Sequence, residues 1–156
     1  MFHPMEDQWP RREHFRHYMD NVRCTYSLTV LIDITALRAG LKEAGQAAYP
    51  AQIYLLAATV NRFPAFRMGL SEAGEPGYWD VLHPSYTIFH QEAKTFSSIW
   101  TRYDPDFARF SAACTADIRR YRDAAAFAPK PDEPPNAFSI SSVPWIDFTA
   151  FNLNVY

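Results

Sequence analysis

The sequence has few of the residues that build the commonest small metal and phosphate sites. It contains two cysteines, Cys24 and Cys114, and no CxxC pair, which excludes a disulfide framework and a cysteine-based zinc site. Its five glycines are scattered, so it has neither a glycine-rich phosphate loop nor a GxSxG nucleophile elbow. None of its five histidines forms HExxH. His14 and His17 could ligate a metal from one helix, but a partly buried and a solvated histidine are the simpler interpretation, and we expect no metal.

An excess of positive charge is also absent. The formal net charge is −2, so no basic field attracts nucleic acid or anionic lipid, and the weak basic cluster of Arg11, Arg12 and Arg16 is interrupted by an acidic residue. The most apolar run, residues 51–60, is too short to span a bilayer. Residues 1–12 contain no apolar stretch typical of a signal peptide. We therefore expect a cytoplasmic protein that binds neither nucleic acid nor membranes.

The chain is rich in aromatic residues. They make up 16% of its 156 residues, and apolar residues make up 48%. This length suits one domain, so residues 1–156 are expected to form a single domain. Aromatic side chains bury a large area each, which favours a rigid core or an apolar pocket. The carboxylates include no pair placed for acid–base chemistry, so these features alone predict only a soluble α/β domain with an aromatic pocket.

Four segments show helical patterns. A helix is expected from Pro10 to about residue 20, because proline is favoured at the first helical position. Apolar residues three and four apart predict helices over 37–44 and 50–62, the latter apolar on most faces and therefore buried. The clearest amphipathic pattern covers 107–121, preceded by the expected cap Asp104 and a proline.

Seven segments show strand patterns. The longest alternation of apolar and polar residues, with a period of two, covers residues 23–34. The expected strands are 23–34, 66–70, 78–82, 86–91, 95–100, 137–143 and 146–155, with a break at His83-Pro84 and a proline-rich loop over 128–136. Strands and helices are interleaved without βαβ regularity. The fold class is therefore α/β (α+β), with a mixed β-sheet and flanking helices.

The last expected strand is as apolar as a central strand, and no later strand follows to pair with it. Such a strand leaves a sheet edge and part of the core uncovered. The pattern therefore predicts a domain that is incomplete at its C-terminus.

Several blocks of the sequence resemble the chloramphenicol acetyltransferase family, in the family's order and spacing over essentially the whole chain. The blocks are WPRREHF (9–15), CTY (24–26), IDIT (32–35), YP (49–50), FRM (66–68), YWD (78–80), HP (83–84), YTIFHQE (86–92), TFSS (95–98), PWIDF (144–148) and FNLNV (151–155). Each block alone is weak evidence, but the set is specific.

The resemblance implies a CoA-dependent acyltransferase fold that assembles as a homotrimer with active sites between subunits. The implied reaction moves acetyl from acetyl-CoA to a hydroxyl of chloramphenicol, which gives antibiotic resistance. In this family the histidine of an HHxxxDG motif is the general base. The motif does not occur in the sequence, and Tyr156 stands where the family has a small residue. We therefore expect this chain to be an inactive fragment by itself.

The resemblance also implies site residues. Ser141 matches the serine that donates a hydrogen bond to the oxyanion, and Arg11 matches the arginine that pairs with the aspartate of the missing motif. Positions that match the acceptor pocket are Tyr18, Val22, Cys24, Tyr26, Phe96, Phe127, Phe151 and Leu153. At this pocket Ala128 stands where the family has phenylalanine, and the neighbouring Phe127 could take its place. Tyr49, Trp145 and Asn152 match positions near the CoA channel.

Two alternatives remain open. One is a non-catalytic binding homologue that keeps the aromatic pocket without the base. The other is an acyltransferase with a different small hydroxylated acceptor, as in dihydrolipoamide acyltransferases. The RREHF block and the full set of pocket aromatics favour chloramphenicol.

Overall fold

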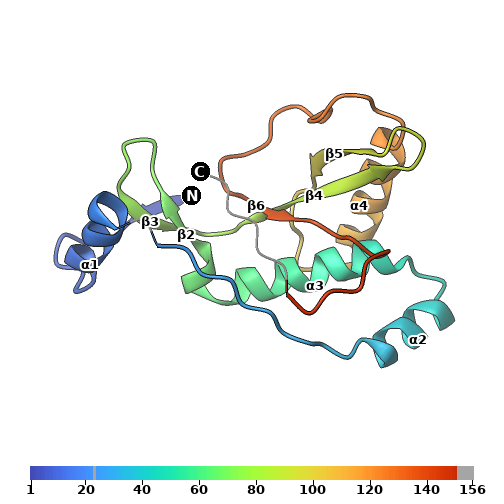
Figure 1. Ribbon diagram of the computed structural model, residues 1–156, viewed down its shortest axis with the longest axis horizontal. Helices are drawn as coiled ribbons and strands as arrows, with labels where there is room; N and C mark the ends of the chain where they lie inside the picture. The colour runs from blue at the N-terminus through green and yellow to red at the C-terminus, as the bar shows by residue number, and fades with distance from the viewer. Residues whose placement is uncertain (23, 151–156) are drawn as a thin grey trace.

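The computed structural model describes residues 1–22 and 24–150, which form two small sheets with flanking helices (Figure 1). The first sheet is antiparallel, in the order β1-β3-β2, with β1 Phe2–Pro4, β2 Met68–Leu70 and β3 Pro76–Trp79. Its strands β2 and β3 correspond to the strands expected over 66–70 and 78–82, and each is shorter than expected. Gly77 lets β1 approach β3, because a Cβ there would collide with the ring of Phe2 and the carbonyl of His3.

The second sheet is mixed, as predicted. Its order is β5-β4-β6, with β4 His83–His90, β5 Thr95–Trp100 and β6 Ala137–Ile140. The strand β4 pairs antiparallel with β5 and parallel with β6. The predicted break at His83-Pro84 is wrong, because both residues belong to β4. The Pro84 carbonyl still accepts a hydrogen bond from the Thr101 N–H at 3.1 Å, and a proline near a strand's start costs little pairing.

The helices follow the predicted segments closely. The first, α1 Arg12–Arg16, continues as a π-helical turn to Asn21, and the others are α2 Thr35–Glu43, α3 Ala48–Arg62 and α4 Phe107–Tyr121. As expected, α3 ends before Pro64, where a 3₁₀ turn, Pro64–Arg67, begins. The predicted cap of α4 is wrong by two residues. Asp106 caps it by accepting from the Arg109 N–H at 2.9 Å, while Asp104 accepts from the Asp106 N–H.

The hydrophobic core lies between the second sheet and helices α3 and α4, which cover it in Figure 1. Its fully buried side chains include Ile53, Tyr86, Ile99, Phe110 and Cys114. Of these, Phe110 and Cys114 belong to α4 and lie on the apolar face that the amphipathic pattern over 107–121 predicts. The expectation that α3 is buried on most faces is wrong, because Leu55 and Leu56 are about half exposed.

The long strand predicted over residues 23–34 is not formed. Residues 24–34 belong to neither sheet, and Tyr26, Leu28 and Leu31 are more than 80% exposed. A period of two specifies which side chains share a face, but a strand also needs a neighbour to pair with. The last two predicted strands, 137–143 and 146–155, also differ from the structure. Strand β6 ends at Ile140, residues 146–150 form no strand, and 151–155 lie outside the described residues.

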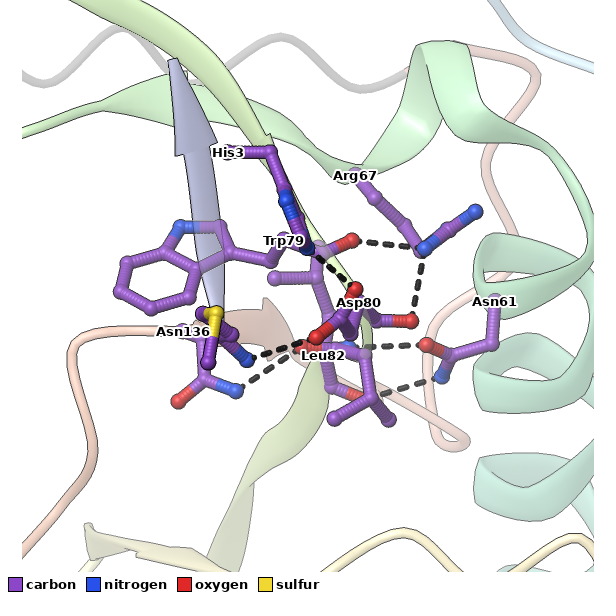
Figure 2. A network of polar contacts seen from close by, with 9 residues as sticks. His3, Asn61, Arg67, Trp79, Asp80, Leu82 and Asn136 are labelled. Carbon is purple, nitrogen blue, oxygen red and sulfur yellow. Dashed lines mark hydrogen bonds and ion pairs between the residues drawn. The ribbon is translucent and has the colours of Figure 1, made fainter.

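A set of polar contacts joins the two sheets (Figure 2). The Arg67 guanidinium donates to the carbonyls of Trp79 and Asp80, each at 2.6 Å. The Asn61 amide exchanges two hydrogen bonds with the backbone of Leu82, at 2.8 and 2.9 Å. The His3 ring contacts the Asp80 carboxylate at 2.6 Å. These contacts fix the segment between β3 and β4 to α3 and to the N-terminal strand.

Candidate functional site

A cavity of about 580 Å³ opens between α2, the start of α3, strand β4 and the residues after β6. The segment that follows β6 contributes Ser142, Pro144 and Trp145 to its wall. Two of the residues matched to the CoA channel, Tyr49 and Trp145, line it together. The structure thus brings together positions almost a hundred residues apart in the sequence.

The Tyr49 side chain is fixed in this cavity from two directions. Its hydroxyl donates to the Thr87 carbonyl at 2.7 Å, and its ring packs edge-on against Tyr86, with centroids 6.0 Å apart. Burial is the main cause that raises the pKa of the Tyr49 phenol. Tyr49 therefore stays neutral near pH 7 and offers an apolar ring face with little freedom to move.

Trp145 is a further aromatic residue in the wall of this cavity. Its ring lies 4.5 Å from the Phe89 ring, centroid to centroid, and 56% of the residue is exposed. A partly exposed indole beside a cavity can stack on a flat or apolar ligand.

Ser141 follows the end of β6 directly and is exposed. Its neighbour Ser142 lines the cavity. Ser141 itself is not among the lining residues, and within residues 1–22 and 24–150 its hydroxyl makes no hydrogen bond to another group. The role of Ser141 as an oxyanion donor stays a prediction from the family resemblance.

Arg11 and Tyr18 lie elsewhere, in a second cavity of about 610 Å³ beside α1. This cavity shares no lining residue with the first. Figure 1 shows α1 next to the N-terminal sheet, at the opposite end of the molecule from α2. The structure therefore does not place Arg11 and Ser141 in one cavity.

The remaining acceptor positions fall in two further places. Phe96 and Phe127 contact each other edge-on, with ring centroids 5.7 Å apart, and both are about half exposed or more. Val22, Cys24 and Tyr26 are exposed on or near the segment 24–34. Ala128 is exposed next to Phe127. The predicted positions Phe151, Asn152 and Leu153 lie outside the described residues.

A buried polar network behind the cavity is not apparent from the sequence. The Tyr86 hydroxyl and the Thr101 hydroxyl are hydrogen-bonded at 2.7 Å, and Thr101 donates to Asp117 at 2.7 Å. The Lys130 ammonium also contacts Asp117, at 2.7 Å. Burial raises the pKa of the Cys114 thiol, which donates to Tyr86, to about 11. These are long-range contacts between β4, Thr101 directly after β5, α4 and the proline-rich loop, which no local pattern reveals.

No group of three or more histidine, cysteine, aspartate or glutamate residues in the described part of the chain could hold a metal ion. No described helix is long and apolar enough to cross a membrane.

Comparison with known proteins identifies the fold and the family. The family model "Chloramphenicol acetyltransferase" matches residues 5–156. A Bacillus pumilus chloramphenicol acetyltransferase is 54% identical over 155 residues, which cover 99% of this chain and 70% of the relative. An Escherichia coli chloramphenicol acetyltransferase 2 is 45% identical over 147 residues, 94% of this chain and 68% of the relative.

A solved chloramphenicol acetyltransferase structure matches with a TM-score of 0.82 at 21% identity, covering 99% of this chain and 75% of the other. This match confirms the predicted α/β fold with a mixed sheet. The fold and the sequence matches define a class of acyltransferases. The chain belongs to the chloramphenicol acetyltransferase family, as its sequence blocks predicted.

Proposed function

We propose that this chain serves the transfer of acetyl from acetyl-CoA to a hydroxyl of chloramphenicol, and so antibiotic resistance, in the cytoplasm. Relatives at 44–54% identity carry the name of this activity and support the proposal. The proposal includes assembly as a homotrimer with active sites between subunits. The exposed acceptor positions suit this, since a neighbouring subunit can cover them.

The cavity between Tyr49 and Trp145 is the observation that carries the proposal. We assign it to acetyl-CoA, with the two aromatic walls against apolar and flat parts of the co-substrate. In this proposal Ser141, the neighbour of the lining residue Ser142, donates to the oxyanion that forms when the acceptor hydroxyl attacks the thioester carbonyl. Arg11 and Tyr18 belong to the acceptor side in this proposal, together with Phe96 and Phe127.

We assign the general base to no residue of 1–156. None of the histidines lines the Tyr49–Trp145 cavity in the described part of the chain, and residues 1–156 contain no HHxxxDG motif. A fusion of residues 1–156 to a segment of a family member that carries this motif supplies the base for kinetic work, and we call it the HHxxxDG fusion.

Calorimetric titration of the 156-residue chain with acetyl-CoA tests the cavity assignment. Trp145→Ala should weaken binding roughly thirtyfold, as truncation of a central aromatic contact does. Trp9→Ala is the matched control, because Trp9 lines the separate cavity beside α1 and should leave acetyl-CoA affinity unchanged. Equal affinity in the wild type and the Trp145 variant would contradict the assignment. Binding with no turnover after base is supplied would favour the non-catalytic homologue.

A further inference from the structure

The Tyr49–Trp145 cavity has one charged residue on its described walls, and that residue is Arg38. The other lining groups are apolar, aromatic or neutral polar, so no carboxylate on these walls opposes the cation. A ligand that fills the cavity therefore meets a net positive charge at the α2 side.

The fold of α2 places Arg38 there. Ile34, the residue before the helix, lies four positions earlier and lines the same cavity, as expected for neighbours on one helix face. The helix start is held by Asp33, whose carboxylate accepts from the Thr35 N–H at 2.8 Å. Leu41, one turn after Arg38, is buried. Arg38 is thus an exposed cation on an anchored helix.

The Arg38 guanidinium has no hydrogen bond or ion pair with any described residue. This distinguishes it from Arg12, Arg67 and Arg109, whose guanidinium groups bind carbonyls or carboxylates. An arginine presents a fork of N–H donors that matches the oxygens of a phosphate. Among the described residues, none occupies the donors of Arg38.

A second cation lies farther along the same wall. A neighbouring cavity of about 580 Å³ shares Ile88, Phe89 and Ile118 with the first, and its lining includes Arg122 and Asp123. The adjacent carboxylate offsets the charge of Arg122. A phosphate group is therefore attracted more strongly to Arg38.

We propose that Arg38 binds a phosphate of the nucleotide part of acetyl-CoA and thereby selects CoA thioesters over shorter pantetheine thioesters. This inference rests on the proposed function, because it takes the cavity to be the acetyl-CoA site. It adds a specificity residue on α2 to the Tyr49 and Trp145 pair. The apolar walls hold the pantetheine and adenine parts, while Arg38 binds the negatively charged phosphate.

Calorimetric titration of the 156-residue chain with CoA and with pantetheine tests the proposal. Arg38→Gln should weaken CoA binding roughly tenfold, the loss expected for a charge-assisted contact to phosphate, and leave pantetheine affinity unchanged. Arg38→Lys should recover part of the loss, since it keeps the charge without the fork. Wild-type affinity for CoA should fall with added salt more steeply than that of the glutamine variant.

Two matched controls remove the same charge elsewhere. Lys42→Gln changes the next turn of α2, outside the cavity lining, and Arg122→Gln changes the neighbouring cavity. Both should bind CoA as the wild type does. CoA affinity unchanged in Arg38→Gln, or a larger loss in Arg122→Gln, would overturn the proposal while leaving the proposed function intact. Wild-type protein that binds no CoA would instead reject the cavity assignment itself, and the Arg38 role with it.

Discussion

Single residues of the site are positioned by contacts from distant parts of the chain. Tyr49 lies in the first turn of α3, but its side chain is held by the Thr87 carbonyl and the Tyr86 ring of β4. Its place near CoA was predicted from the family resemblance, and the structure puts it in a cavity with Trp145. Arg38 was not predicted as a site residue, because its place in the cavity lining depends on how α2 lies relative to β4. A charged residue on an expected helix is otherwise indistinguishable from a solvated one.

At Ser141, we predict a selective loss of turnover. In the HHxxxDG fusion, Ser141→Ala should lower kcat about 10²–10³-fold with little change in KM, because its hydrogen bond is stronger in the transition state. Ser139→Ala is the control, since Ser139 is an exposed serine of β6 two residues earlier. Steady-state thiol release measures both. A kcat in the Ser141 variant equal to that of the control would show that Ser141 is only a structural serine.

The two thiols should differ in reactivity. Cys24 is exposed, whereas Cys114 is buried and its pKa is raised to about 11, so its thiolate is scarce below that pH. A chromogenic disulfide reagent at pH 8 should therefore modify one thiol rapidly in the native chain and the second only in denaturant. Cys24→Ala should abolish the rapid phase. Two rapid equivalents in native buffer would disagree with the burial of Cys114.

At the scale of elements, local patterns predicted the helices and most of the paired strands, but they missed strand β1 and did not specify the long-range partners. The α4 stripe and the β4–β5 pairing follow from periodicity and short separation. The parallel pairing of β4 with β6 does not, since it joins residues such as Ser85 and Ser139 across the α4 helix. For residues 24–34 the alternation predicted a strand, yet pairing depends on a neighbour that the alternation itself does not specify.

The Lys130–Asp117 pair should stabilise the joint between α4 and the proline-rich loop. Both side chains are less than 20% exposed, and the Lys130 ammonium also lies 4.5 Å from the centre of the Trp100 ring. Lys130→Met should lower the free energy of unfolding by about 1–3 kcal/mol, because it leaves a largely buried carboxylate without its cation.

Urea denaturation measures this change. Arg109→Met is the control, because it breaks an exposed ion pair with Asp104, and it should cost less than about 1 kcal/mol. Equal effects of the two substitutions would show that burial adds nothing to the Lys130 pair.

At the scale of the whole molecule, the two sheets are joined by the contacts of Figure 2, while a long apolar segment remains uncovered. Tyr26, Leu28, Leu31 and Ile32 are at least 75% exposed. Exposed apolar patches of this kind promote association. The single domain expected over residues 1–156 thus has a large surface available to other chains.

The 156-residue chain should therefore associate in solution rather than remain a monomer. Leu28→Lys combined with Leu31→Glu should shift the equilibrium toward monomer, because charges on this segment oppose its burial. Size-exclusion chromatography with light scattering gives the mass. As a control, Leu55→Lys places a charge on the partly exposed face of α3 and should not change the mass. A monomeric wild type at micromolar concentration would contradict this prediction.

Acetyl transfer to chloramphenicol can be measured directly as thiol release from acetyl-CoA, on the folded HHxxxDG fusion and on residues 1–156 alone. We expect acetyl transfer by the fusion, and a rate at least about a hundredfold lower for residues 1–156, which lack the motif's general base. A folded fusion that binds acetyl-CoA but transfers no acetyl to chloramphenicol, or equal rates for the two proteins, would contradict this expectation.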